Sequence, residues 1–64
     1  MDIINKLEAR HREEVADIDA YTRLMNEARE NSMHHLADVL SLVIKDEKSH
    51  RDFIAEYIKE YRKK

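Results

Sequence analysis

The chain has 64 residues, with 12 lysines and arginines against 14 aspartates and glutamates, and a formal net charge of −2. This length permits one domain at most, and the near balance of charge argues against nucleic acid or an anionic membrane as a partner. The absence of cysteine excludes disulfides and thiolate metal sites. No apolar run approaches the roughly 20 residues that cross a bilayer, and the N-terminus has no signal-peptide pattern, so a cytoplasmic protein is expected. Glycine and proline are also absent while 41% of the residues are charged, which predicts an all-α protein.

The first predicted helix covers residues 2–30. Its mainly apolar positions recur at alternating steps of three and four, which is the spacing of a helix packed in a bundle. We call this line the first seam, and its members are Ile4, Leu7, His11, Glu14, Ile18, Tyr21, Met25 and Ala28.

A phase break follows at residues 31–34, where Asn31 and Ser32 favour a turn because their short side chains compete for backbone hydrogen bonds. We expect the chain to reverse there, with either residue capping a second helix over 35–62. The alternative is one continuous helix. The second helix has a seam of its own, made of Leu36, Leu40, Val43, Glu47, His50, Ile54, Tyr57 and Tyr61.

Two helices of this length share only one seam, which is too little to build a core. Small domains that bury little surface depend on metals, disulfides or oligomerisation, and disulfides are excluded here. The sequence therefore predicts an antiparallel two-helix hairpin that forms a four-helix bundle by pairing with itself, as a homodimer or within a higher homo-oligomer.

Polar residues interrupt both seams at one height. In a hairpin that turns near residue 32, residue numbers at one level add up to about 64, which Glu14 and His50 satisfy. Glu47 lies one turn from His50 on the same face. Because burying an unpaired carboxylate costs several kcal/mol, something must compensate these charges.

A two-fold pairing would place four carboxylates and two imidazoles in this layer, and two cations would balance the four negative charges. Oxygen ligands with one nitrogen per metal favour iron or manganese, with zinc as a substitute. The alternative is that Glu14 and Glu47 reach solvent at the edge of the seam and that His50 is an ordinary core histidine.

Three features resemble the ferritin-like superfamily. Glu14 precedes Tyr21 by seven residues, the segment Asp46-Glu47-Lys48-Ser49-His50 carries Glu-x-x-His, and Glu14 precedes Glu47 by 33 residues. Half of a ferritin-like ligand set on a two-helix chain is most similar to the encapsulated ferritins, and to halves of bacterioferritin and rubrerythrin. The resemblance implies two iron ions per dimer, ferroxidase-type activity, and an encapsulating shell as a further partner.

The resemblance also implies roles for single residues. Glu47 would bridge the two metals, His50 would bind one of them through a ring nitrogen, and Glu14 would be a terminal ligand. Asp46 would hold the other ring N–H of the partner's histidine. Tyr21 would assist catalysis by donating a hydrogen bond to a ligand carboxylate of the partner, and plain core packing is the alternative.

His11 lies one turn before Glu14, where it is either an additional ligand, part of an iron access route, or a space-filling core residue. Two alternatives to ferroxidase function remain open at this stage. One is a metal-binding or metal-stabilised bundle without turnover, and the other is a metal-free helical assembly module in which the polar residues fix register.

Overall fold

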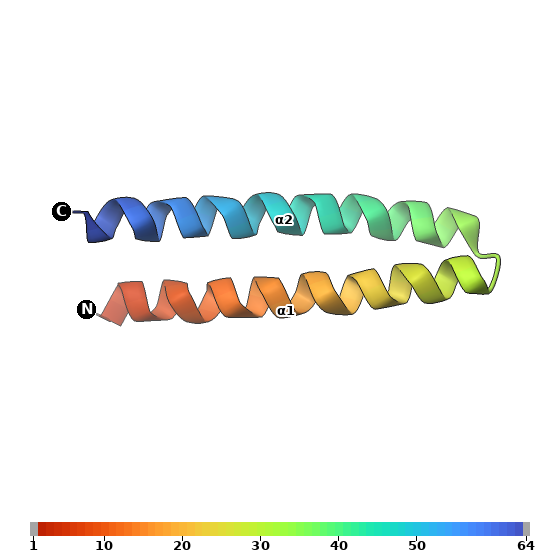
Figure 1. Cartoon of the computed structure of the whole chain (residues 1–64), viewed down its shortest axis with the longest axis horizontal. Coiled ribbons are helices and arrows are strands. Elements are labelled where there is room, and N and C mark those ends of the chain that lie inside the picture. Colours follow the sequence, from red (N-terminus) through yellow and green to blue (C-terminus); the bar gives the residue numbers. More distant parts are fainter. Residues whose placement is uncertain (1, 64) are drawn as a thin grey trace.

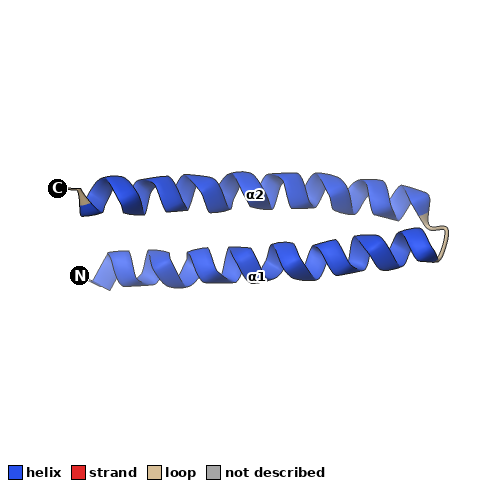
Figure 2. Cartoon of the chain, in the orientation of Figure 1, coloured by secondary structure: helices blue, strands red, loops and turns tan. Residues whose placement is uncertain are grey.

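The computed structural model describes residues 2–63, which fold into two antiparallel helices joined by a tight turn (Figure 1, Figure 2). Helix α1 spans Asp2–Glu30 and helix α2 spans His34–Arg62, with 29 residues each. The described residues contain no strand, and the chain reverses direction between the helices. The predicted all-α hairpin is therefore confirmed, and the continuous helix is excluded.

The turn satisfies its backbone groups locally. Ser32 has a φ of 58°, in the left-handed region. The backbone N–H of Met33 donates to the carbonyl of Ala28 at 2.8 Å, and the N–H of Ser32 donates to that of Arg29 at 3.1 Å. This pair of bonds is a Schellman motif, in which glycine usually takes the left-handed position. Here Ser32 takes it.

The expected cap of the second helix is wrong. Helix α2 begins at His34, one residue earlier than expected, and Met33 precedes it without any side-chain capping hydrogen bond. Asn31 and Ser32 are used instead to end α1, because the Asn31 side chain donates to the Glu27 carbonyl at 2.8 Å and Ser32 supplies the left-handed residue.

The first seam lies as expected, since all its members are buried or half-buried against α2. The second seam is displaced. The residues of α2 that lie deepest against α1 are Ala37 and Ile44, while Leu36, His50, Tyr57 and Tyr61 are exposed. The reason is that α2 is apolar over a wider arc than one neighbour can cover. Ala37 and Ile44 take the positions that face α1, and the exposed members of the predicted line are left at the open side of the hairpin.

The hairpin is a rod rather than a compact domain. Its extents are 49 × 14 × 12 Å and its radius of gyration is 14.8 Å, against about 11 Å for a compact chain of this length. Its accessible surface is 5105 Å², whereas a folded monomer of this mass exposes about 4,300 Å². No large side chain among the described residues is fully buried. The hairpin thus lacks an enclosed core.

Candidate metal centre

Glu14 of α1 and Glu47 and His50 of α2 meet in the middle of the rod. One ligand atom from each of the three side chains lies within 4.8 Å of the other two. Two causes bring them together: the turn sets Glu14 level with this part of α2, and an i,i+3 spacing puts Glu47 and His50 on one face.

Glu14 is the buried member of the group, with an exposed fraction of 6%. Its Oε1 atom lies 3.7 Å from Nη2 of Arg10, and its Oε2 atom is buried with no hydrogen-bond partner. Leaving a buried polar atom unsatisfied costs about 1–3 kcal/mol, and more when the group is charged. The alternative that Glu14 reaches solvent is therefore wrong, and its orphaned oxygen destabilises the metal-free hairpin.

Glu47 lies beside Glu14, and its side chain is 21% exposed. A hydrogen bond with the Glu14 carboxyl group raises the pKa of Glu47, and burial and the negative charges of Glu14 and Asp17 raise it further. The nearby His50 opposes this change. Two carboxyl groups at this distance favour sharing a proton or a cation over both ionising without one.

His50 completes the group from the open side of the hairpin. Its Nδ1 atom lies 3.8 Å from Oε1 of Glu47, and its side chain is 59% exposed. The alternative that His50 is a buried core histidine does not hold for the hairpin. An exposed imidazole is free to reorient, which matters because metal–ligand bonds of about 2.1 Å place two ligand atoms roughly 3–4 Å apart. Small side-chain rotations would bring the three atoms within that range.

The other predicted site residues lie outside this group. Tyr21 is half-buried, about 10 Å along α1 from Glu14. Asp46 is exposed next to Glu47. His11 is half-buried and lines a groove of about 260 Å³ together with Glu8. The roles predicted for these three residues stay predictions.

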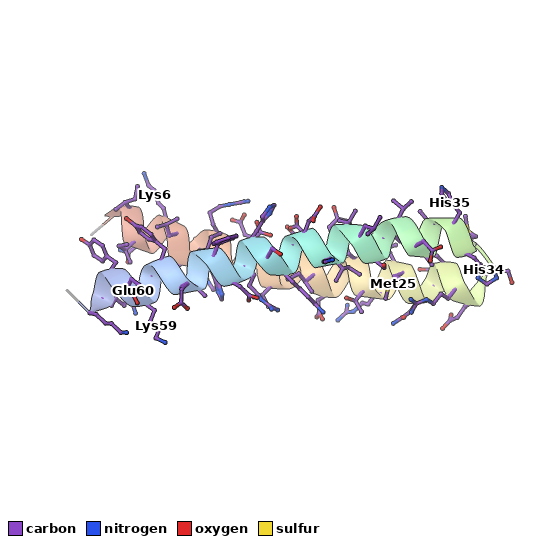
Figure 3. All side chains as sticks on the ribbon, turned by 90° about the horizontal axis from the view of Figure 1, so that it is seen from above. Lys6, Met25, His34, His35, Lys59 and Glu60 are labelled. Carbon is purple, nitrogen blue, oxygen red and sulfur yellow. The ribbon has the colours of Figure 1, made fainter. Side chains whose placement is uncertain are left out.

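The remaining histidines are far from the centre. His34 and His35 lie at the turn end of the rod, and both are exposed (Figure 3).

Two charged residues near the centre were not foreseen. Arg10 contacts both Glu13 and Glu14, and Asp17 adds its charge to the field at Glu47. Arg10 precedes Glu14 by four residues and Asp17 follows it by three, so the ordinary helical neighbour rule would have identified both.

Comparison with protein-family models, curated proteins and solved structures found no match for this chain. The ferritin-like resemblance therefore rests on the residues described above. Neither described helix combines the length and apolar character required to cross a membrane.

Proposed function

We propose that two copies of the hairpin pair into a four-helix bundle that binds two iron ions and oxidises Fe(II). The proposal rests on one observation: the orphaned Oε2 atom of Glu14 lies in a cluster with Glu47, whose pKa is raised, and with an accessible imidazole. A metal cation would give the orphaned oxygen of Glu14 a partner and could bind Glu47 and His50 at the same time.

Pairing with a second copy is supported by the apolar surface on the side where His50 is exposed. A groove of about 380 Å³ lies between the helices toward the termini and is lined by Ile3, Ile4, Leu7, Phe53, Ile54, Tyr57 and Tyr61. A second groove, of about 300 Å³, lies toward the turn and is lined by Leu24, Glu27, Ala28, Asn31, Met33, Leu36 and Leu40. The surface in excess of a compact monomer is about 800 Å², which is the area one partner buries in an interface of standard size.

Charge balance sets the stoichiometry. A pair of hairpins brings four carboxylates into the layer, and two divalent cations neutralise them. Carboxylate oxygens with one imidazole nitrogen per ion suit iron and manganese, and zinc would compete for the same ligands. Two iron ions per dimer are therefore proposed, with manganese or zinc as substitutes.

Iron is the substrate of the proposed reaction. Two Fe(II) ions give up two electrons, which with two protons reduce O₂ to hydrogen peroxide, or hydrogen peroxide to two molecules of water. The chain contributes the positions and charge of Glu14, Glu47 and His50. Asp46 and Tyr21 are proposed to orient ligands across the pair, and a protein shell remains the proposed further partner of the assembly.

Iron loading tests the proposal. Fe(II) added without oxygen and then exposed to air should give a ferric absorbance that rises faster than in buffer, saturating at two ions per dimer. Glu47→Gln and His50→Gln should return the rate to that of buffer. Glu56→Gln, which changes an exposed carboxylate of the same helix, should keep the wild-type rate. Circular dichroism of each variant verifies that the helices remain.

The same samples separate the competing functions. Zinc or manganese that raises the melting temperature, with Fe(II) oxidation at the buffer rate, would establish a metal-stabilised bundle without turnover. A melting temperature unchanged by any divalent ion would overturn metal binding and leave an assembly module.

A further inference from the structure

Helix α1 carries a second line of residues that its packing against α2 does not use. Every seventh residue from Ile3 belongs to it: Ile3, Arg10, Asp17 and Leu24. Ile3 is 59% exposed, Leu24 is 50% exposed, and the Arg10 side chain is 59% exposed. Residues repeated at this interval form one stripe along a helix, and such a stripe suits a neighbouring helix.

This stripe faces the same side of the hairpin as the metal centre. Ile3 lines the groove toward the termini together with Tyr57, and Leu24 lines the groove toward the turn together with Leu36. Between them, Arg10 reaches Glu14 and Asp17 acts on Glu47. Asp17 forms no ion pair with any residue in the described part of the chain, so its charge is uncompensated within the hairpin.

The order of the stripe is apolar, positive, negative, apolar, and it is complementary to itself when reversed. In an antiparallel copy of α1, Ile3 lies opposite the partner's Leu24 when Arg10 lies opposite the partner's Asp17. The residue numbers of both pairs, 3 with 24 and 10 with 17, add up to 27. One register therefore joins both apolar pairs and both charge pairs, as a two-fold interface requires.

The midpoint of that register lies between residues 13 and 14, at the level of Glu14. The open side of α2 places the midpoint at the same level. Its line of residues is also spaced by seven and consists of Leu36, Val43, His50 and Tyr57. Reversed on itself, this line sets Leu36 against the partner's Tyr57 and Val43 against the partner's His50, with a midpoint between residues 46 and 47. Glu14 and Glu47 are neighbours in the cluster, so a single axis serves both helices.

We propose that the second copy docks with this open side, α1 antiparallel to the partner's α1 and α2 antiparallel to the partner's α2, and that two Arg10–Asp17 pairs fix the register. The proposal rests on the pairing in the proposed function and adds its orientation. The terminal groove of each hairpin then meets the turn-end groove of the other, so the apolar linings cover each other. The two groups of Glu14, Glu47 and His50 face each other across the axis.

A competing arrangement places α1 against the partner's α2, with the termini of both hairpins at one end. Residues at one level add up to about 64, so it would set Arg10 level with the partner's Ile54 and Asp17 level with the partner's Glu47. Neither charge meets an opposite charge across this interface. Asp17 would keep its uncompensated charge and would face a like charge, so this arrangement is disfavoured.

Engineered cysteines distinguish the two arrangements, because the chain has none of its own. Positions 3 and 24 are about 31 Å apart along one helix, so a disulfide between them joins two chains. Ile3→Cys and Leu24→Cys, mixed in equal amounts and oxidised without metal, should give a covalent dimer containing one copy of each. Each variant alone should stay uncrosslinked. A covalent dimer from Ile3→Cys alone, with none specific to the mixture, would overturn the proposed orientation.

Charge reversal tests the register. Arg10→Glu alone and Asp17→Arg alone each create two like-charged contacts, so the dimer dissociation constant of each metal-free variant should rise at least about tenfold. An equimolar mixture restores both opposite-charge contacts and should form the heterodimer more tightly than either variant pairs with itself. Arg12→Glu, on the far side of α1 beside the groove lined by His11, is the matched control and should change the dissociation constant little. No preference for the heterodimer would overturn the Arg10–Asp17 pairing.

These measurements use metal-free protein, so they fail separately from the proposed function. The expected cross-links without Fe(II) oxidation would support the proposed docking and overturn the proposed ferroxidase activity. Fe(II) oxidation without the expected cross-links would support the proposed metal centre and overturn the proposed orientation of the two copies.

Discussion

The turn and the metal layer are opposite cases of how a short sequence satisfies its polar groups. At the turn, the backbone N–H groups of Ser32 and Met33 and the side chain of Asn31 all find acceptors within a few residues. At the candidate metal layer, Glu14 is buried with an orphaned oxygen, and a hydrogen bond with its carboxyl group raises the pKa of Glu47. The local hydrogen bonds of the turn stabilise the reversal of the chain, whereas the unpaired oxygen of Glu14 supports the proposed metal binding.

The largest expected effect is stabilisation by metal. A ligand that binds only the folded state, at a thousand times its dissociation constant, adds about 4 kcal/mol to the free energy of unfolding. For a domain of this size that corresponds to a rise in melting temperature of more than about 10 °C. Calorimetry at one fixed protein concentration, with manganese or zinc against a chelator, measures the change. Glu47→Gln should remove most of it, and an equal rise in that variant would place the ion elsewhere.

Replacing the buried carboxylate should have the opposite sign without metal. Glu14→Leu removes a 6%-exposed charged group and its unpaired oxygen, so the metal-free protein should gain about 1–3 kcal/mol of unfolding free energy. The same variant should lose its stabilisation by metal. Chemical denaturation with and without metal measures both effects. Asp19→Leu, at an exposed site of α1, is the control and should stay within about 0.5 kcal/mol of wild type. A destabilised metal-free Glu14→Leu would mean that the carboxylate is satisfied after all.

The pH dependence of the metal-free protein should follow from Glu47. Its pKa is raised above the ordinary value of 4.5 in the folded state, so folding favours its protonated form. This contribution to stability is complete below about pH 4.5 and is lost as the pH rises through the folded pKa. The unfolding free energy of wild type minus that of Glu47→Gln should therefore fall with rising pH. With metal present the sign reverses, because the ion binds the ionised carboxylate. A flat difference without metal would contradict the shared proton.

The hairpin could be predicted from the sequence because helical periodicity and the phase break are local patterns. The first seam follows from helical periodicity, and the phase break at residues 31–34 located the reversal. Because the turn also sets which residues are level, it could be predicted that Glu14, Glu47 and His50 would come together, and the structure places them within 4.8 Å.

The missed features depend on three-dimensional choices that periodicity leaves open. Helix α2 is apolar over a wide arc, so its pattern fits two neighbours, and only packing shows that Ala37 and Ile44 face α1. The cap was misassigned because Asn31 and Ser32 serve equally well to end one helix or to begin the next. Ser32 in a left-handed conformation was the least foreseeable, since that position usually requires glycine.

The turn provides the smallest and most local prediction. A non-glycine residue in the left-handed region costs about 1 kcal/mol, part of which glycine returns by loosening the unfolded chain. Ser32→Gly should therefore stabilise the hairpin by about 0.5 kcal/mol, a rise of a few degrees in melting temperature. Ser32→Ala keeps the Cβ atom and should give no gain, so the pair of variants isolates the backbone effect. Because the turn is remote from the metal layer, the stabilisation by metal should be the same in Ser32→Gly as in wild type. A changed response to metal would mean that the two regions are coupled, and that the turn helps to hold Glu14 level with Glu47 and His50.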